Sequence, residues 1–432
     1  MKLIKLITVI AFLSISVVIV KAQRGFEDPK YRENVSQIIT KPSIINSTTK
    51  SHSKCNSSTL HNQKMINDPA YRRNVEDLEL QIKNRKEQTN VARRPAPYTI
   101  PVVFHVMYKN DDPEGSGTNI SKEQLYSSID ALNRDFKKLA DDAGIAQGNG
   151  AAMDITFCPA QRDPFDNPSD GIERINVTNQ TYIDKGIQGS GNNGYSEVDL
   201  KALSKWDPSK YMNVWVVTEI DDSGADDLSS YGGGTLGYAY FPGAGTDVDG
   251  IVVTHTSCGN DPDGTNNFNL WAFSTLNRTM THEVGHYLSL YHTFEGNSCS
   301  EPISSCSTQG DLCCDTPPTT EGDNCTPGCA GGQPENYMDY TSETCQNMFT
   351  ADQQTRMYTA LDGLRAGLNS STGCNPVNNY DAGISSIIQP NGSYCGDIIS
   401  PVVQLTNYGS QNLTNVTITY SIDNGPNQEF IW

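Results

Sequence analysis

Three histidines and a glutamate in one short stretch have the types and spacing to bind zinc and activate water. His282 and His286 are four residues apart, so on a helix both imidazoles leave the same face, one turn apart. Glu283 follows the first, where a carboxylate can polarise a water on the metal. His292 lies six residues beyond His286, about 600° of helix, so the chain must leave the helix near Ser289. Three imidazoles leave one of the four coordination positions of zinc open, as in catalytic sites. The alternative interpretation of the motif is a surface histidine pair beside a solvated glutamate.

A second segment, about 45 residues further along, supports the catalytic interpretation. It reads NYMDY at 336–340 and places Met338 where the turn beneath a zinc site would lie. Together with it, the stretches HEVGHYLSLYHTF, GDLCCDTP and NYMDYTSETCQNMFT resemble the pappalysin family of metzincin zinc metalloproteases, above all its bacterial, ulilysin-like members. The resemblance covers Pro101 to Leu368. One position departs: family members carry glycine where this chain has Ser289, and a left-handed serine there would cost about 1–2 kcal/mol.

The resemblance also implies roles for residues around the zinc. Glu283 is the expected general base, and Tyr340 is expected to help stabilise the oxyanion. Glu343 stands where relatives carry an aspartate that faces the side chain after the scissile bond and selects arginine or lysine. We expect the same basic preference here, in a pocket made shallower by the longer side chain. The alternative is that Glu343 is a solvated loop charge beside Cys345.

Strands alternate with helices through the body of the chain, which predicts a mixed α/β fold. The apolar run at 98–108 predicts a buried strand, and Ser121 is placed to cap the amphipathic helix that follows. We expect further strands at 153–158, 212–217 and 250–255, and helices at 121–139, 196–206 and 349–368. The resemblance implies an α/β (α+β) metzincin catalytic domain, with a twisted mixed sheet above a cleft and the zinc helix as the floor of that cleft.

Seven of the 12 cysteines lie in a loop-rich segment from Cys299 to Cys345. In an exported protein this density indicates disulfides that hold loops without a core of their own. A four-cysteine zinc knuckle is the alternative, but the segment lacks the paired C-x2-C units it needs. The spacing leaves the connectivity open. The resemblance implies two bonds: Cys325–Cys345, and Cys329 to Cys299 or Cys306. The adjacent Cys313 and Cys314 depart from the family, and we expect them to add a further bridge.

The same segment carries oxygen ligands suited to calcium. Asp311, Asp315 and Thr316 stand in GDLCCDTP, on an irregular loop whose geometry calcium tolerates. Pappalysin-like relatives hold calcium here, so the resemblance implies Ca²⁺ as a second metal beside Zn²⁺. The alternative is a turn whose aspartates accept hydrogen bonds from their own backbone.

The N-terminal part of the chain differs in charge from the rest. Residues 1–22 begin with Lys2 and Lys5, continue with an apolar run and end at a small-residue site at Ala22, which predicts a secretory signal peptide. The run is short for a membrane anchor. The first 94 residues contain 17 basic and 8 acidic side chains, whereas the remainder contains 14 and 42. A basic leader should therefore dock on an acidic body. We interpret 23–94 as a propeptide that ends at the dibasic pair Arg93-Arg94.

Two features of the leader predict structure and function. A similar segment occurs at 28–35 and again at 68–75, each time with an aspartate to cap a helix and a proline in its first turn. Cys55 is the leader's only cysteine and resembles the propeptide cysteine of relatives, so we expect its thiolate to bind the zinc and keep the enzyme latent. Because the number of cysteines is even, the alternative is a disulfide between Cys55 and the body.

The body divides into two parts that differ in their residue pattern. Residues 95–373 would form the catalytic domain. From 374 to 432 the sequence changes to short β-rich stretches at 384–388, 402–406 and 415–422, separated by Asn/Gly turns. This pattern is typical of an Ig-like β-sandwich, but the stretch is too short for a complete one, so we expect a truncated domain.

These features predict a secreted zinc endopeptidase made as a zymogen, with protein or peptide substrates and the propeptide as an intramolecular inhibitor. A formal net charge of −19 argues against nucleic acid as a partner, and no stretch after the signal is apolar enough to span a membrane. The competing hypothesis is a catalytically silent scaffold, stabilised by zinc, whose sandwich binds a polysaccharide or another surface. Such a scaffold has no need for Glu283. A zinc amidase of another class has no support once Met338 and Tyr340 are counted.

Overall fold

The computed structural model describes residues 55–87, 97–139, 150–225, 234–296, 298–377, 380, 382–389, 401–407, 411–420 and 428–432. The predicted signal peptide, the first copy of the leader repeat and the pair Arg93-Arg94 lie outside these residues. One compact unit includes the described residues from 55 to 374, apart from 165–168, and a second includes those from 375 to 432. No helix in the described part of the chain is long and apolar enough to cross a membrane.

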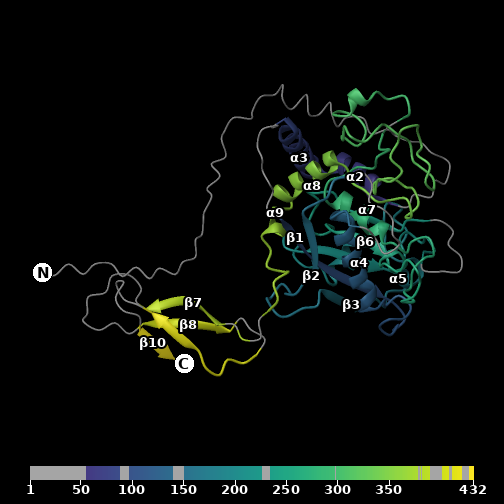
Figure 1. Cartoon of the computed structure of the whole chain (residues 1–432). Helices are drawn as coiled ribbons and strands as arrows, with labels where there is room; N and C mark the ends of the chain where they lie inside the picture. Colours follow the sequence, from purple (N-terminus) through teal and green to yellow (C-terminus); the bar gives the residue numbers. More distant parts are fainter. Residues whose placement is uncertain are drawn as a thin grey trace. The chain divides into compact units, whose positions relative to one another are not determined.

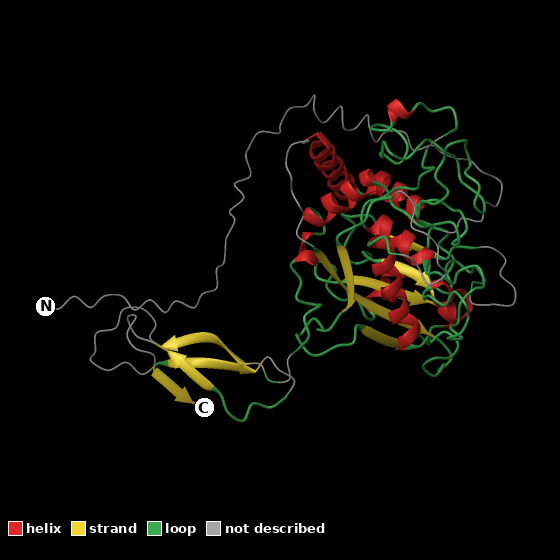
Figure 2. Cartoon of the chain, viewed as in Figure 1, coloured by secondary structure: helices red, strands yellow, loops and turns green. Residues whose placement is uncertain are grey.

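A mixed sheet lies at the centre of the larger unit (Figures 1 and 2). Its order is β2-β1-β4-β6-β5, and β3 pairs with the second half of β1. Neighbouring strands are parallel except β5, which runs antiparallel to β6. The strands are β1 (Tyr98–Tyr108), β2 (Ile155–Pro159), β3 (Ile172–Asn176), β4 (Met212–Val217), β5 (Gly237–Ala239) and β6 (Ile251–Thr254). The mixed α/β architecture is confirmed; β3 and the short β5 have no counterpart among the strands expected from the sequence.

Helices pack against this sheet around one large apolar core. Alternate residues of β1 face this core together with Leu125, Ile129, Leu132 and Phe136, the predicted inner face of α4. Ser121 caps that helix by accepting a hydrogen bond from the backbone of Gln124, as its position predicts. The helices of the body are α4 (Lys122–Phe136), α5 (Gln180–Lys185), α6 (Glu197–Ala202), α7 (Arg278–Tyr287), α8 (Ala351–Asp362) and α9 (Ala366–Asn369). The single helix expected at 349–368 is therefore two helices, because the chain turns at Gly363.

Two leader helices, α2 (Ser57–Asn67) and α3 (Pro69–Glu87), belong to the same unit as the sheet. The Asp68 carboxylate accepts hydrogen bonds from the backbone N–H groups of Ala70 and Tyr71, with Pro69 as the first helical residue. The predicted helix start is thus confirmed for the second copy of the repeat. Helix α3 runs along α8 (Figure 1), where Leu78 and Ile82 pack on Ala360.

Four disulfides connect described residues: Cys158–Cys374, Cys299–Cys329, Cys306–Cys314 and Cys325–Cys345. They include the pairs that the resemblance implies, with Cys299 rather than Cys306 as the partner of Cys329. Cys314 forms the further bridge, and Cys313 is a buried free thiol. The bond Cys158–Cys374 spans 216 residues and had not been expected.

The smaller unit contains two antiparallel strand pairs. β7 (Ala382–Gln389) pairs with β8 (Val402–Asn407), and β9 (Thr417–Tyr420) pairs with β10 (Gln428–Ile431). Three of these strands lie where the sequence predicts them. An Ig-like arrangement stays a prediction.

Candidate active site

The three histidines of the predicted zinc site converge on one point. Helix α7 carries His282 and His286 one turn apart, with their Nε2 atoms 3.0 Å apart. The Nε2 atom of His292 lies 3.1 Å from each of them. Tetrahedral zinc with Zn–N bonds of about 2.0–2.1 Å would set these nitrogens about 3.3 Å apart, so the triangle fits the ion with little movement. All three side chains are buried, unlike a surface histidine pair.

The backbone fixes the orientation of the two helical imidazoles. His282 Nδ1 lies 2.7 Å from the carbonyl oxygen of Tyr337, and His286 Nδ1 lies 2.7 Å from that of Leu290. A carbonyl oxygen can only accept, so each Nδ1 carries the proton and each Nε2 presents its lone pair to the centre. Burial, first of all, holds the pKa of His286 well below its usual value, which keeps this ring neutral and able to bind a metal.

The turn that delivers His292 begins at Ser289. Helix α7 ends at Tyr287, and Ser289 has φ = 81°. This is the left-handed conformation, which costs conformational free energy for serine but not for glycine. Arg356 from α8 supports the turn: its Nε donates to the Ser289 carbonyl oxygen at 3.0 Å. The chain leaves the helix where the histidine spacing predicts, and a buried arginine from a distant helix holds it there.

Met338 packs directly beneath α7. Its sulfur lies against Gly285 so closely that a Cβ added to Gly285 would collide with it. The amide of Met338 donates to the side-chain oxygen of Asn336, and the neighbouring Tyr337 supplies the carbonyl that orients His282. The methionine turn thus supports the helix and also positions a ligand.

Glu283 and Cys55 face each other beside the three imidazoles. The Cys55 sulfur and the three Nε2 atoms all lie within 4.8 Å of one another. Cys55 Sγ lies 3.4 Å from Glu283 Oε2, which also accepts a hydrogen bond from Ser57 Oγ at 2.9 Å. Burial raises the pKa of Glu283 to about 8 and raises that of Cys55 well above its usual value. A divalent cation between these groups would lower both pKa values. Cys55 forms no disulfide with any described cysteine.

The residues after Cys55 occupy the cleft next to the edge strand. Cys55 forms a parallel bridge with Gly237 of β5, and Ser57 Oγ accepts a hydrogen bond from the Ala239 amide. The Tyr340 hydroxyl donates to the Cys55 carbonyl oxygen at 3.1 Å. Ser58 Oγ lies 3.0 Å from His292 Nδ1. The leader therefore contacts the zinc ligands, the glutamate and the tyrosine at once.

A cavity of about 350 Å³ opens beside His282 and Glu283. Glu343 lines it, as do Tyr340 and Asp323. The Glu343 carboxylate is not a solvated loop charge: it accepts hydrogen bonds from Ser274 Oγ, the Leu276 amide and the Arg278 amide. It therefore caps the N-terminus of α7, and burial raises its pKa.

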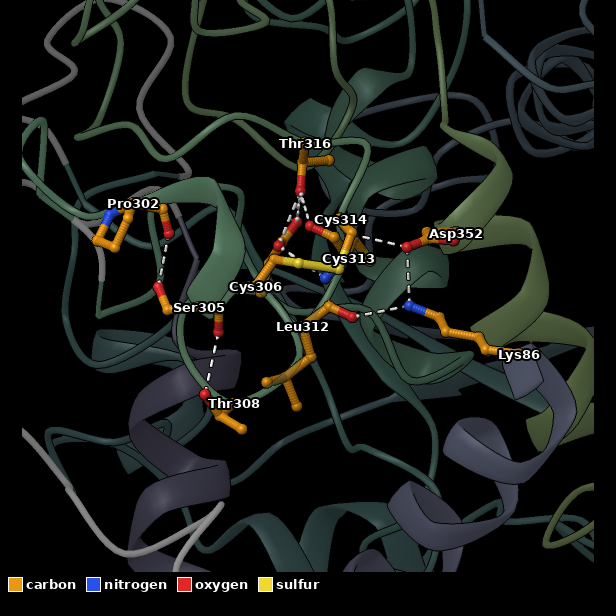
Figure 3. The surroundings of a disulfide bond; sticks show 11 residues. Lys86, Pro302, Ser305, Cys306, Thr308, Leu312, Cys313, Cys314, Thr316 and Asp352 are labelled. Carbon is orange, nitrogen blue, oxygen red and sulfur yellow. Dashed lines mark hydrogen bonds and ion pairs between the residues drawn. A yellow bond between two sulfur atoms is a disulfide. The ribbon is translucent and has the colours of Figure 1, made fainter.

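The residues expected to bind calcium lie in a loop beside the leader. Asp311 is buried and accepts hydrogen bonds from the Cys313 amide and Thr316 Oγ1, whereas Asp315 accepts one from the Asp352 amide. Figure 3 shows this loop, where leader residue Lys86 bridges the Leu312 carbonyl and Asp352. The Asp311 bonds match the alternative, a turn closed by its own aspartate, whereas the Asp315 bond ties the loop to the start of α8. Among the described residues, Cys55 and the three histidines form the one group of three or more His, Cys, Asp or Glu side chains that could hold a metal ion.

Sequence reasoning missed several residues of this site. Ser57 lies two residues after Cys55, and this closeness in sequence could have suggested that it reaches the same site. Gly285 stands inside the H-E-x-x-H motif, where a glycine signals close approach of another segment. Arg356 gave no local signal, because only the docking of α8 brings it to Ser289.

Comparison with known proteins agrees with this site. A family model described as "Pregnancy-associated plasma protein-A", a peptidase family, matches residues 194–362. An extracellular metalloprotease of Colletotrichum graminicola is 30% identical over 290 residues, which is 64% of this chain and 81% of that protein. Extracellular metalloprotease 1 of Coccidioides posadasii is 32% identical over 232 residues, covering 48% and 74% respectively.

Solved structures show the same fold. A variant of Tannerella forsythia promirolysin superposes with a TM-score of 0.54 at 27% identity, covering 74% of this chain and 97% of that chain. Mirolysin in complex with a compound superposes with a TM-score of 0.50 at 29% identity, covering 65% and 100%. Given the converging histidines and these matches, the chain belongs to the pappalysin family of metalloproteases.

Proposed function

We propose that this protein is a secreted zinc endopeptidase made as a zymogen. The observation that carries the proposal is the convergence of three Nε2 atoms beside the buried Glu283, with the leader's Cys55 sulfur in the same group. Secretion is supported by the predicted signal peptide and by relatives named extracellular metalloproteases.

Each catalytic group has a defined task in peptide hydrolysis. Zinc held by His282, His286 and His292 supplies Lewis acidity, polarising the scissile carbonyl and making water a better nucleophile. Glu283 accepts the proton of the attacking water and passes it to the leaving amine. Its Oε1 atom is buried and has no hydrogen-bond partner among the described residues, so this oxygen still has its capacity to accept a hydrogen bond. Tyr340 would donate a hydrogen bond to the developing oxyanion.

The leader would block every one of these tasks. Cys55 would give its thiolate to the open zinc position, Ser57 holds the second oxygen of Glu283, and the Tyr340 hydroxyl is bonded to the leader backbone. Removal of the leader would free all three sites together. This overlap supports latency by occupation of the catalytic groups, with the propeptide as an intramolecular inhibitor.

The cavity supports a preference for arginine or lysine after the scissile bond. Glu343 lines it next to His282, and a desolvated carboxylate favours a basic partner. The same preference would allow the enzyme to cut its own leader before Arg93 or Arg94. Glu343→Gln tests this role, because glutamine keeps an acceptor for the helix amides but removes the charge; unchanged cleavage sites would exclude it.

Calcium is proposed as a second, structural metal at Asp311, Asp315 and Thr316. The proposal is supported by the family resemblance of the GDLCCDTP segment and by the burial of Asp311.

A peptide library incubated with the processed protein separates the enzyme from the alternative, a silent zinc-stabilised scaffold. We expect cleavage that a zinc chelator abolishes and added zinc restores. A silent scaffold would cut nothing, whereas the chelator would lower its melting temperature.

A further inference from the structure

The cavity beside the zinc site contains a carboxylate that the proposed mechanism does not use. Asp323 lines this cavity together with Glu283 and Glu343, and it is exposed. Its backbone is hydrogen-bonded to Thr326, but its carboxylate has no hydrogen-bond or ion-pair partner among the described residues. A charge on a cavity wall without a partner is available to a ligand of opposite sign.

The other acidic residues of the cavity are already engaged. Glu343 accepts three hydrogen bonds at the start of α7 and lies within the field of the Arg278 guanidinium. Asp339 accepts bonds from the amides of Gly322 and Tyr340 and from a threonine hydroxyl. Part of the hydrogen-bonding capacity of Glu343 and Asp339 is therefore used within the protein, whereas that of the Asp323 carboxylate is not.

The position of Asp323 is fixed relative to Glu343. The bonds Asp323 N–H to Thr326 O (3.0 Å) and Thr326 N–H to Asp323 O (2.8 Å) close a tight turn. The Cys325–Cys345 disulfide then joins the two segments, because each acidic residue stands two positions before one of its cysteines. Because the backbone is held this way, little loop ordering is needed when the Asp323 side chain binds a ligand.

The cavity also has two properties expected of a ligand-binding site. Its volume of about 350 Å³ is within the usual range of ligand pockets, about 300–1,000 Å³. Glu283 Oε1 lies buried in its wall without a partner among the described residues, which points to a reactant in the adjoining space.

We propose that Asp323 forms an ion pair with the basic side chain that follows the scissile bond, in the same cavity that Glu343 lines. This inference rests on the proposed preference for arginine or lysine. A guanidinium has five donors in a planar fork and can bond to both oxygens of one carboxylate at once, whereas an ammonium is a point charge. Arginine should therefore depend on Asp323 more strongly than lysine does.

The test uses full-length protein activated by the same limited trypsin digestion for every variant. Peptides that differ only after the scissile bond, with Arg, Lys or Met there, give three values of kcat/KM. Asp323→Asn should lower kcat/KM for the Arg peptide about tenfold, chiefly through KM, and leave the Met peptide unchanged. Asp323→Glu should restore part of the loss. Glu321→Gln is the matched control, because Glu321 is exposed, lies two residues before Asp323 and is not among the residues that line the cavity.

The outcomes separate this inference from the proposed function. If wild-type protein cuts the Arg and Met peptides equally well, the basic preference itself is wrong. If it prefers Arg but Asp323→Asn and Glu321→Gln behave alike, the preference stands and Asp323 has no part in it. An equal loss on all three peptides would also overturn the inference, because it would indicate damage to the cleft. Added salt should reduce the Arg preference of the wild type, since an exposed ion pair is screened.

Discussion

Arg356 of the catalytic unit and Glu79 of the leader form a two-bond ion pair, with N–O distances of 2.9 and 2.5 Å. The Arg356 side chain is buried, and its Nε also donates to the carbonyl oxygen of Ser289. Through this one guanidinium, a leader residue is connected to the turn that brings His292 to the metal. The leader thus reaches the zinc site twice, directly through Cys55 and indirectly through Arg356.

Glu79→Gln should loosen the leader, because the buried Arg356 would lose its charged partner. Breaking one side of a buried ion pair costs about 3–5 kcal/mol. In a Glu283→Gln background, which prevents self-cleavage, we expect lower stability in urea and faster trypsin cleavage of the leader. Asp77→Asn, at an exposed position on the same helix, is the control. Equal behaviour of the two variants would show that the ion pair does not hold the leader.

Glu283→Gln should keep the zinc and lose peptide cleavage. Glutamine has nearly the same shape but cannot accept the proton of the attacking water, so we expect a loss of about 10²–10⁴-fold in kcat. Metal content by atomic absorption and kcat on a peptide substrate check both halves. Near-normal activity with bound zinc would contradict the assigned role.

Cys55→Ala should give activity to the unprocessed chain, because the open zinc position would no longer be filled by the thiolate. Cys258→Ala is the matched control, since Cys258 is likewise buried and in no described disulfide but lies outside the metal-binding group. Peptide cleavage by the intact chain, with its length verified by mass spectrometry, is the measurement. If the intact Cys55→Ala chain is fully inactive, the Cys55 thiolate is not what keeps the enzyme latent.

His61 should make the docking of the leader sensitive to acid. This leader side chain is buried against Phe241 and Tyr291, and its Nδ1 lies 2.7 Å from the Tyr71 hydroxyl. Burial lowers the pKa of His61 to about 4 from a usual value of 6.5, with smaller effects from Glu295, Glu79 and Arg356. The neutral ring is favoured in the folded chain, so its contribution is complete above pH 6.5 and is lost as the pH falls toward 4.

The loss from His61 at pH 5 should be about 2 kcal/mol. The melting temperature of the unprocessed chain at pH 7.5 and pH 5 measures it, with His61→Phe as the comparison. The variant should lose less stability than the parent on acidification. An identical pH dependence in both proteins would assign the acid sensitivity to other groups.

Calcium should stabilise the loop around Asp311, if the site is formed as proposed. Binding to the folded protein alone adds about 2.7 kcal/mol at a hundredfold excess over the dissociation constant. A calcium-selective chelator should therefore lower the melting temperature, and Asp311→Asn should remove this response. An unchanged melting temperature on adding the chelator would mean that the aspartates close a turn and bind no calcium.

What the sequence determined by itself is the chemistry that follows from local periodicity. His282, Glu283 and His286 could be placed on one helix because 3.6 residues per turn set their directions without reference to the rest of the chain. The exit near Ser289 followed from the same geometry, and so did the apolar face of α4. Strands with long apolar runs, such as β1 and β4, were predictable for the same reason.

The tertiary structure alone decided which distant residues support that chemistry. Arg356 reaches Ser289 only when α8 docks, Glu343 caps α7 across 65 residues, and Cys158 meets Cys374 across 216. Nothing in a local pattern encodes these contacts, since they depend on how whole elements pack. The sequence could also not tell that Glu343 accepts three hydrogen bonds while the Asp323 carboxylate has no described partner, because only the fold brings Ser274, Leu276 and Arg278 to Glu343.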